Sequence, residues 1–329
     1  MFVVTGGAGF IGSNLVKKLE DLYPTTEVVV VDVFGSSEKW QNIVKRFNIS
    51  GIIAPSELLS FLDQNSQKIQ AIFHLGAISS TVEKDVDLIV DSNIRLSLKL
   101  WNWCTHHATP FIYASSAATY GDGERGFSDD MSSENLRSLR PLNAYGWSKH
   151  FFDLQALRLS AENKCPPQWA GLKFFNVYGP NEDHKGGQKS VIATFYPQIL
   201  KEGKIRLFKS NDPAYKDGEQ LRDFVWVGDC VNVMVWLYQN PTISGLFNIG
   251  TGQARSFNDL AKSVFKALSR PVVIDYVDMP ESLQNKYQNF TEASLTNLRN
   301  AGYVHPFTSL EEGVRLYVQN FLMQADPYL

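Results

Sequence analysis

The chain has 329 residues, of which 44% are hydrophobic and 20% charged, a composition typical of globular proteins and unlike that of disordered, collagenous or coiled-coil chains. Its 31 Lys and Arg residues and 34 Asp and Glu residues give a net charge of −3, so no basic excess favours nucleic acid or an acidic membrane surface as a partner. The 3 cysteines lie far apart, which excludes a disulfide framework and a cysteine metal site and favours a reducing compartment.

Short apolar runs alternate with amphipathic stretches through the first half of the chain. The runs predict strands at Phe2–Val4, Val28–Val31, Ala71–His74, Phe111–Ala114 and Leu172–Phe175. Helical patterns lie between them, for example at Ser13–Leu22 and Val90–Cys104. Strands that alternate with helices indicate βαβ units, so we predict an α/β fold with a doubly wound parallel sheet.

The second half of the chain has a different pattern. Turn-rich segments at Asn181–Gly187 and Asn211–Gly218 alternate with helical patterns at Ser190–Lys201, Asp229–Tyr238 and Asn258–Leu268. This mixture predicts a smaller, discontinuous α/β domain. We place the sheet domain at residues 1–175 with 225–249, and the smaller domain mainly at residues 176–224 with 250–329, as approximate boundaries.

A glycine-rich loop follows the first predicted strand and opens the first helix. In Thr5-Gly6-Gly7-Ala8-Gly9-Phe10-Ile11-Gly12 the glycines have the spacing of a dinucleotide-binding loop, and Asp32 ends the second strand about 20 residues on. Glycines let the backbone approach a pyrophosphate, and the free N–H groups of a helix N-terminus attract it. The loop in this context predicts a dinucleotide-binding Rossmann domain.

The residues that follow the second strand leave the choice between NADP and NAD open. Asp32 suits the ribose hydroxyls of NAD, and its charge would repel the 2′-phosphate of NADP. Lys39 or Arg46 could offset that repulsion, although Lys39 could equally be a solvated helix residue. The residues alone therefore predict a nicotinamide cofactor without distinguishing the two forms.

Two further motifs carry groups that suit proton transfer. Ser116 follows a predicted strand, at the edge where a parallel sheet binds ligands, although a buried serine pair that caps a strand is an alternative. Tyr145 and Lys149 have a spacing that places both on one face of a helix, where the ammonium would lower the pKa of the phenol from its usual value of about 10. Such a phenol can take a hydroxyl proton while a hydride leaves for the cofactor.

Together, the glycine loop, the Ser116 segment and the Tyr145/Lys149 pair resemble the extended short-chain dehydrogenase/reductase superfamily over most of the chain. The resemblance implies a nucleotide-sugar substrate and a catalytic triad of Ser116, Tyr145 and Lys149, supported by Asn93. Sugar dehydratases of this superfamily carry Thr-Asp-Glu where this chain has Ser116-Ala117-Ala118. Because the acids that drive loss of water are missing, epimerisation or simple oxidoreduction is favoured.

Lys185 follows the last predicted strand of the first half and lies between a histidine and a glycine. Inversion at a carbon requires acid/base groups on both sides of a planar ketone, and a desolvated lysine can reach a pKa near neutrality. The residues leave two roles open for Lys185: a second acid/base group, or a contact to the pyrophosphate of the substrate.

Within the superfamily the chain resembles most closely the ADP-L-glycero-D-manno-heptose 6-epimerases. The matching stretches are Gly6–Asn14, Phe73–His74, Gly76–Ala77, Tyr113–Gly121, Tyr145–Lys149, Phe175–Pro180, His184–Gly186, Arg222–Val225, Lys286–Gln288 and Phe290–Thr291. This resemblance implies Tyr145 and Lys185 as the two acid/base catalysts, an ADP-heptose substrate for lipopolysaccharide core biosynthesis, and NADP as the cofactor, with NAD as the alternative. It also implies a homo-oligomer, in the family a pentamer.

The same resemblance implies the ligand contacts, and it assigns no residue to a metal. The implied cofactor contacts are Gly6, Gly9, Phe10, Ile11, Gly12, Asp32, Val33, Lys39, Leu75, Gly76, Ala77, Ile78, Ser79, Asn93, Lys149, Val177 and Lys185. The implied substrate contacts are Ser116, Asn176, Gly187, Thr194, Phe208, Lys209, Ser210, Asn211, Arg222 and Tyr287. Gly187 and Thr194 stand where the family has serine and histidine, and the stretch 32–53 is shorter than in the family.

Other functions remain as alternatives. Another nucleotide-sugar epimerase, such as one acting at the fourth carbon, or a reductase would use the same motifs. A non-catalytic cofactor sensor is disfavoured because the Tyr145/Lys149 motif is retained, and a nucleic-acid-binding module would require a basic stripe. No apolar run is long enough to span a membrane and the N-terminus has no signal-peptide pattern, so we expect a cytoplasmic protein that does not bind membranes.

Overall fold

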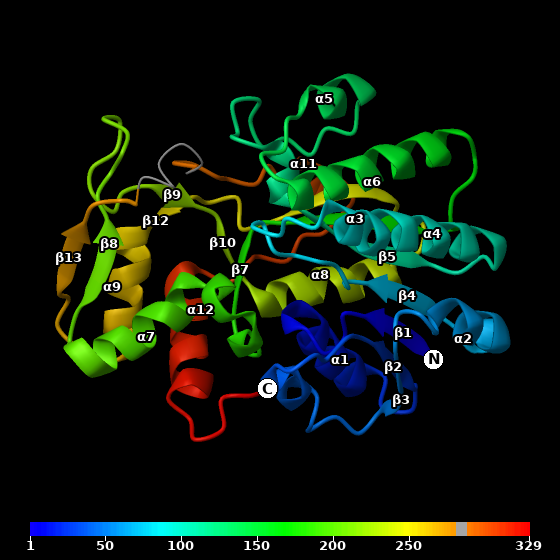
Figure 1. Ribbon diagram of the computed structural model, residues 1–329, viewed down its shortest axis with the longest axis horizontal. Helices are drawn as coiled ribbons and strands as arrows, with labels where there is room; N and C mark the ends of the chain where they lie inside the picture. Colours follow the sequence, from blue (N-terminus) through cyan, green and yellow to red (C-terminus); the bar gives the residue numbers. More distant parts are fainter. Residues whose placement is uncertain (281–287) are drawn as a thin grey trace.

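The computed structural model describes residues 1–280 and 288–329 (Figure 1). Its largest element is a sheet of seven strands, all parallel, in the order β11-β6-β5-β4-β1-β2-β3. The strands are β1 (Phe2–Thr5), β2 (Val28–Val31), β3 (Ile49–Ile53), β4 (Ala71–His74), β5 (Phe111–Ser116), β6 (Trp169–Phe174) and β11 (Gly245–Ile249). The predicted doubly wound sheet is confirmed, and β3 and β11 are strands that the apolar runs did not reveal.

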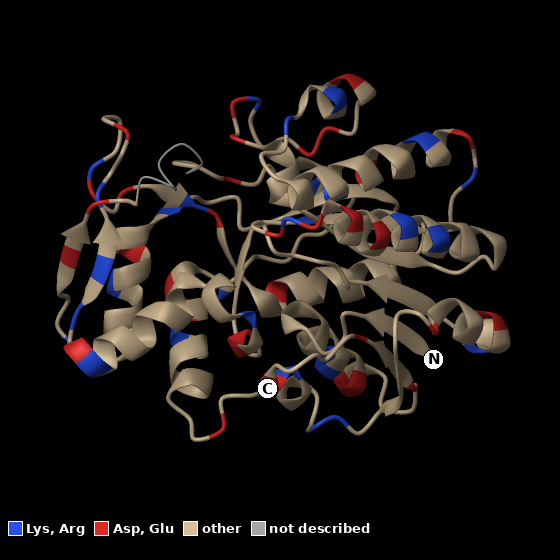
Figure 2. Cartoon of the chain, viewed as in Figure 1, with Lys and Arg blue, Asp and Glu red and all other residues tan. Residues whose placement is uncertain are grey.

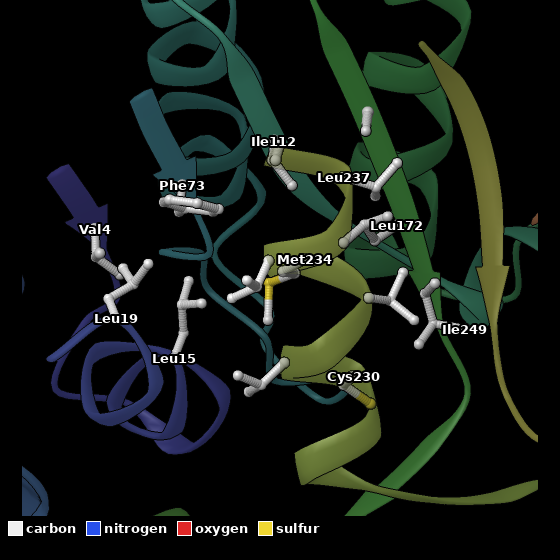
Figure 3. Packing of buried hydrophobic residues seen from close by; sticks show 14 of the residues in the cluster. Val4, Leu15, Leu19, Phe73, Ile112, Leu172, Cys230, Met234, Leu237 and Ile249 are labelled. Carbon is white, nitrogen blue, oxygen red and sulfur yellow. The ribbon is translucent and has the colours of Figure 1, made fainter. Parts of the chain in front are cut away.

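Helices cover both faces of the sheet, α1 and α8 on one and α3, α4 and α6 on the other (Figure 1). These helices are α1 (Phe10–Leu22), α3 (Val86–Ile89), α4 (Leu96–His106), α6 (Ala144–Ala161) and α8 (Val227–Gln239), and α2 (Leu58–Asn65) lies between β3 and β4 in the chain. Burial on both faces explains the unbroken valine run of β2, whose side chains are at most 1% exposed. Figure 3 shows one of the two cores, where Leu15 and Leu19 of α1 and Met234 of α8 pack towards Phe73 and Leu172 of the sheet.

Segments from the second half form a smaller lobe with its own core. The lobe consists of α7 (Val191–Glu202), β8 (Ile205–Phe208), α9 (Phe257–Ala267), β13 (Ile274–Val277) and α12 (Leu310–Tyr317). Side chains such as Ile192, Leu207 and Val264 fill this core. Figure 1 shows these elements at one end of the large sheet. The domain boundaries given by the sequence remain a prediction.

Three two-stranded sheets link or complete the lobes. Strand β7 (Asn176–Tyr178) pairs in parallel with β10 (Phe224–Trp226), β9 (Leu221–Arg222) pairs antiparallel with β12 (Arg255–Ser256), and β8 pairs in parallel with β13. The other helices and helical turns in the part of the chain that the structure describes are short. They are η1 (Glu38–Asn42), η2 (Ser66–Lys68), η3 (Val90–Arg95), η4 (Ala117–Tyr120), α5 (Ser133–Ser138), η5 (Asp183–Gln188), α11 (Thr296–Asn300) and η6 (Val318–Leu322).

The strand order reverses at β1, which lies between β2 and β4. In a doubly wound sheet the crevice at the carboxyl ends of the strands on either side of such a reversal is where ligands bind. Lys and Arg are interspersed with Asp and Glu along the outer helices and loops (Figure 2). Among the described residues, no helix is long and apolar enough to cross a membrane.

Candidate active site

A cleft of about 760 Å³ opens at the carboxyl ends of the central strands. All four predicted catalytic residues line it: Ser116, Tyr145, Lys149 and Lys185. Most predicted cofactor contacts line it as well: Gly6, Gly9, Phe10, Ile11, Gly12, Asp32, Lys39, Leu75, Gly76, Ala77, Ser79 and Val177. The structure therefore brings motifs from β1, α1, β4, β5, α6 and η5 to one cavity.

The glycine loop forms a tight cradle at the start of α1. Gly6 has a φ of +67°, and its backbone packs against Gly76 at the end of β4, where a side chain on Gly6 would collide. A side chain on Gly12 would collide with the carbonyl oxygen of Gly6. Gly9 caps α1 without a side-chain hydrogen bond, and the first turn holds no acidic residue. The free N–H groups of this turn therefore fit the diphosphate of a dinucleotide.

Asp32 and Lys39 form an ion pair at the adenosine end of the cleft. The Lys39 ammonium lies 2.8 Å from the Asp32 carboxylate and also donates to the carbonyl of Val33 at 2.8 Å. The backbone N–H groups of Ala8 and Val33 donate to the same carboxylate. Lys39 is thus held next to Asp32 rather than extended into solvent, whereas Arg46 pairs with Glu20.

Helix α6 carries Tyr145 and Lys149 on the face that meets β5. Asn143 starts the helix, and its side chain accepts a hydrogen bond from the N–H of Gly146 at 2.8 Å. The Lys149 ammonium is buried and donates to the carbonyl of Ala114 at 2.8 Å. Burial lowers the pKa of Lys149 to about 8, although the charge of Asp153 opposes this shift.

The expectation that Lys149 lowers the pKa of Tyr145 is wrong for this structure. Burial of the Tyr145 hydroxyl raises its pKa, and the hydrogen bond with Ser116 offsets only part of the increase. The Lys149 ammonium is directed to the carbonyl of Ala114 instead. Spacing on a helix predicts that two side chains share a face, but it does not predict which acceptor the longer side chain reaches.

Lys185 reaches the cleft from η5, so it comes from a different element than Tyr145. Its ammonium lies 5.3 Å from the centre of the Phe10 ring, at the start of α1. Burial lowers the pKa of Lys185, and the nearby Glu182 carboxylate opposes the shift. A buried lysine with a lowered pKa can hold or release a proton closer to neutrality, which suits an acid/base group.

The cleft is also lined by seven residues that the sequence analysis did not assign to the site. They are Thr81, Ala114, Ser115, Phe174, Phe175, His184 and Gln188. His184 is the most informative, because its Nδ1 lies 3.2 Å from the amide nitrogen of Asn42. Burial and the charges of Lys39 and Lys185 lower the pKa of His184 to about 4, which keeps the ring neutral. Its position directly before Lys185, on the turn after a strand, was a signal that could have identified it.

Three predicted cofactor contacts, Val33, Ile78 and Asn93, lie beside the cleft and do not line it. Asn93 lies in η3, where its side chain binds both the N–H and the carbonyl of Ile78 and donates to the Ser148 hydroxyl at 3.0 Å. Ser148 donates in turn to the carbonyl of Tyr145. Asn93 therefore supports the loop after β4 and the first turn of α6 together.

Of the predicted substrate contacts, Ser116 and Gly187 line the cleft. The others among the described residues lie outside it: Asn176, Thr194, Phe208, Lys209, Ser210, Asn211 and Arg222. The Arg222 guanidinium is buried, lies 5.6 Å from the centre of the Phe257 ring and donates to the carbonyls of Leu221 and Gln288. Tyr287 lies outside the described residues, as does Lys286.

Comparison with known proteins identifies the family. Residues 2–250 match the model of the NAD dependent epimerase/dehydratase family. The chain belongs to this family. Two relatives, from Nitratidesulfovibrio vulgaris (strain DP4) and Fusobacterium nucleatum, are named ADP-L-glycero-D-manno-heptose-6-epimerase. They are 49% and 46% identical to this chain, and each alignment covers 100% of this chain and 100% of the relative. The crystal structure of the Helicobacter pylori protein of that name has a TM-score of 0.78 at 28% identity, over 97% of this chain and 95% of that one.

Among the described residues, the cleft lacks the acids that the sequence analysis associated with a dehydratase. Ser116 is followed by Ala117 and Ala118 in η4. Asp32 is the one carboxylate among the cleft-lining residues that the structure describes, and Lys39 holds it at the adenosine end. The cleft of this family member therefore offers hydroxyl and amine groups for proton transfer.

Proposed function

We propose that this protein is a nucleotide-sugar epimerase that interconverts ADP-D-glycero-D-manno-heptose and ADP-L-glycero-D-manno-heptose. The observation that carries the proposal is the cleft that joins a dinucleotide cradle to Tyr145, Lys149 and Lys185 without a second acid for elimination. The full-length relatives share the name of this activity. In this proposal the product serves lipopolysaccharide core biosynthesis.

When bound, a nicotinamide cofactor would take a hydride from carbon 6 of the heptose and return it to the other face. The chain supplies the proton transfers. Tyr145, in hydrogen-bond contact with Ser116, would take the hydroxyl proton as the ketone forms in one direction. Lys185, which reaches the cleft from η5, would take that role in the other direction.

The Lys149 ammonium has a different role in this proposal. Its bond to the carbonyl of Ala114 fixes its position at the end of β5, next to Ser116. A positive charge there would stabilise negative charge that develops on the sugar oxygen as the ketone forms. Asn93, through Ser148, holds the first turn of α6 in place and so fixes the direction of the Tyr145 side chain.

We also propose that NADP is the preferred cofactor. The Lys39–Asp32 ion pair offsets the carboxylate charge that would repel a 2′-phosphate, and Lys39 and His184 lie at the same end of the cleft. NAD remains the alternative, because Asp32 can also accept ribose hydroxyls. The cytoplasmic location and the homo-oligomer expected from the sequence stay predictions.

Replacing Lys39 by Met should shift the cofactor preference from NADP towards NAD. The loss of one charge-assisted contact to the 2′-phosphate should weaken NADP binding by about 10-fold or more, whereas NAD binding should stay within about twofold. Calorimetric titration of the cofactor-free protein with each dinucleotide measures both affinities. Lys17→Met, which removes a surface lysine paired with Asp21 on α1, is the matched control. If Lys39→Met weakened the binding of NADP and of NAD equally, Lys39 would not be the contact to the 2′-phosphate.

Two assays test the function itself. Incubation with ADP-D-glycero-D-manno-heptose should yield a mixture of both carbon-6 epimers by NMR, and incubation with UDP-galactose should yield no epimer. Mass spectrometry of the small molecules released on denaturation should show NADP. Epimerisation of UDP-galactose with an inert ADP-heptose would favour a different nucleotide-sugar epimerase, and net accumulation of reduced cofactor with either sugar would favour an oxidoreductase.

A further inference from the structure

A charged pair lies fully buried behind the catalytic helix and has no part in the proton transfers proposed above. Asp153 of α6 and Lys173 of β6 are 2.7 Å apart, and their side chains are 0% and 1% exposed. Neither residue lines the cleft. Most buried charges in proteins are paired in this way, but a pair of apolar residues of similar size is often as stable or more stable. A buried ion pair at this place therefore calls for a reason other than stability alone.

The pair ties together four elements around the end of β5. The Asp153 carboxylate accepts hydrogen bonds from the Tyr113 hydroxyl at 3.0 Å and from the Ser115 hydroxyl at 2.7 Å, both on β5. The Lys173 ammonium also donates to the Thr119 hydroxyl of η4 at 2.8 Å and lies 5.1 Å from the centre of the Tyr120 ring. Helix α6, strands β5 and β6 and the turn η4 thus meet at one buried ion pair.

The network lies close in the chain to three of the catalytic residues. Asp153 lies one helical turn beyond Lys149 and two turns beyond Tyr145, so the three side chains share a face of α6. Ser115 directly precedes Ser116, and Ala114, the acceptor of the Lys149 ammonium, directly precedes Ser115. In the register between β5 and β6, Ser115 lies opposite Lys173. The network therefore fixes the strand end relative to the helix.

The charge of Asp153 also acts on Lys149. Burial lowers the pKa of Lys149 to about 8, and Asp153 opposes that shift. On the β4 side, His74 is buried, and burial together with the charge of Lys149 lowers its pKa to about 3, so it is neutral. On α6 itself, burial and the charge of Lys173 lower the pKa of His150. Asp153 is thus the carboxylate that faces Lys149, while Lys173, Tyr113, Tyr120 and His150 face Asp153.

We propose that Asp153 and Lys173 are positioning residues: the buried carboxylate, held by Lys173, fixes the end of β5 against α6 and so places the Ala114 carbonyl that holds the Lys149 ammonium. The same carboxylate is the charge that acts on Lys149. The kinetic part of this inference rests on the proposed epimerase function. The alternative is a purely structural pair, whose removal changes stability and leaves the protonation of Lys149 unchanged.

The decisive variant is the double substitution Asp153→Asn with Lys173→Met, which removes both charges and leaves neither partner buried alone. We expect the titration midpoint of Lys149 to fall, because Asp153 is the charge that raises its pKa while burial, which lowers it, remains. NMR titration of protein labelled with ¹³C at the lysine ε-carbon measures this midpoint without cofactor or substrate, and Lys149→Met identifies the signal.

The pH dependence of catalysis should follow the same direction. Because Lys149 acts while charged, kcat/KM should decline as the pH rises through its pKa, and this alkaline decline should begin at a lower pH in the double variant. Asp229→Asn is the matched control, because Asp229 is a buried carboxylate on α8 that binds Thr308 away from the cleft. It should leave both the Lys149 midpoint and the alkaline decline unchanged.

Tyr113→Phe provides a second test that changes no charge and keeps the buried ring. It removes one hydrogen bond to Asp153, and we expect kcat to fall several-fold with KM unchanged because the strand end is less firmly held. A wild-type Lys149 midpoint in the double variant would overturn the charge-setting role, and a wild-type kcat in Tyr113→Phe would overturn the positioning role. If the double variant does not fold, the Tyr113→Phe result decides. If wild-type protein does not epimerise ADP-heptose, the proposed function fails, while the NMR titration still tests the pair.

Discussion

Tyr145→Phe should lower kcat by about 10²-fold or more while the protein stays folded and binds its cofactor normally. The substitution removes one oxygen and keeps the ring that packs at the start of α6. That oxygen lies in the cleft, in hydrogen-bond contact with Ser116, at the point where the proposed mechanism takes the sugar hydroxyl proton. Steady-state kinetics with each heptose epimer, together with mass spectrometry of the bound cofactor, measures both parts of the expectation.

The pH dependence gives this prediction a second readout. Burial raises the pKa of Tyr145, so the phenol is protonated through the neutral range and its small phenolate fraction grows as the pH rises towards that pKa. The rise in rate with pH should therefore be reduced in Tyr145→Phe. Tyr276→Phe is the matched control, since the Tyr276 hydroxyl contacts Asn258 in the smaller lobe and does not line the cleft. A Tyr145→Phe variant that retained more than half of the wild-type kcat would remove Tyr145 from the acid/base role.

Local sequence patterns predicted most of the large sheet. The valine run of β2 and the apolar runs of β1 and β4 coincide with strands because both of their faces are covered by helices. The edge strand β3 escaped prediction because its residues alternate between partly buried and exposed positions and include Gly51. Strand β6 begins at Trp169, earlier than its apolar run suggested, and it contains Lys173, which is buried only because Asp153 lies opposite.

The site was predictable where a short stretch of backbone sets the geometry. The glycine loop and the Tyr145/Lys149 spacing depend on one turn and one helix, so their residues reach the cleft as expected. The bond of Lys149 to Ala114 and the pKa of Tyr145 depend on burial by distant segments. His184 beside Asn42 is a contact between elements far apart in the chain. Asp153 and Lys173 lie on the consecutive elements α6 and β6, but the packing of the helix on the sheet, rather than a local spacing, brings them together.

The substrate contacts were the least predictable part. Arg222 lies in β9, which pairs with β12 next to the smaller lobe, and no local pattern in the sequence sets where this strand lies relative to the cleft. The chain pattern gave helices in this region, but it did not indicate which of their side chains face the cleft. The resemblance to a family supplied those residues, and their roles remain a proposal.

Lys185→Met should lower kcat by about 10²-fold or more with little change in KM, if Lys185 is the second acid/base group. The sequence left a second role open, a contact to the pyrophosphate of the substrate, and the two roles have different kinetic signatures. Loss of a pyrophosphate contact would raise KM and leave kcat nearly unchanged, because such a contact is made equally in the ground state and the transition state.

The position of Lys185 favours the acid/base role, in which kcat falls and KM changes little. Its ammonium lies against Phe10 at the start of α1, in the same cleft as Tyr145, and burial lowers its pKa. Lys189→Met is the matched control, because Lys189 lies directly after the same turn and pairs with Asp183 away from the cleft.

Single-turnover reduction of the bound cofactor separates the two acid/base groups further. Because each group is expected to take the proton from one of the two epimers, Tyr145→Phe and Lys185→Met should each slow this reaction mainly with a different epimer. Equal slowing of both epimers in both variants would contradict opposite-side proton transfer. A raised KM with wild-type kcat in Lys185→Met would instead assign Lys185 to substrate binding, and Tyr145 would then have to serve both faces of the ketone.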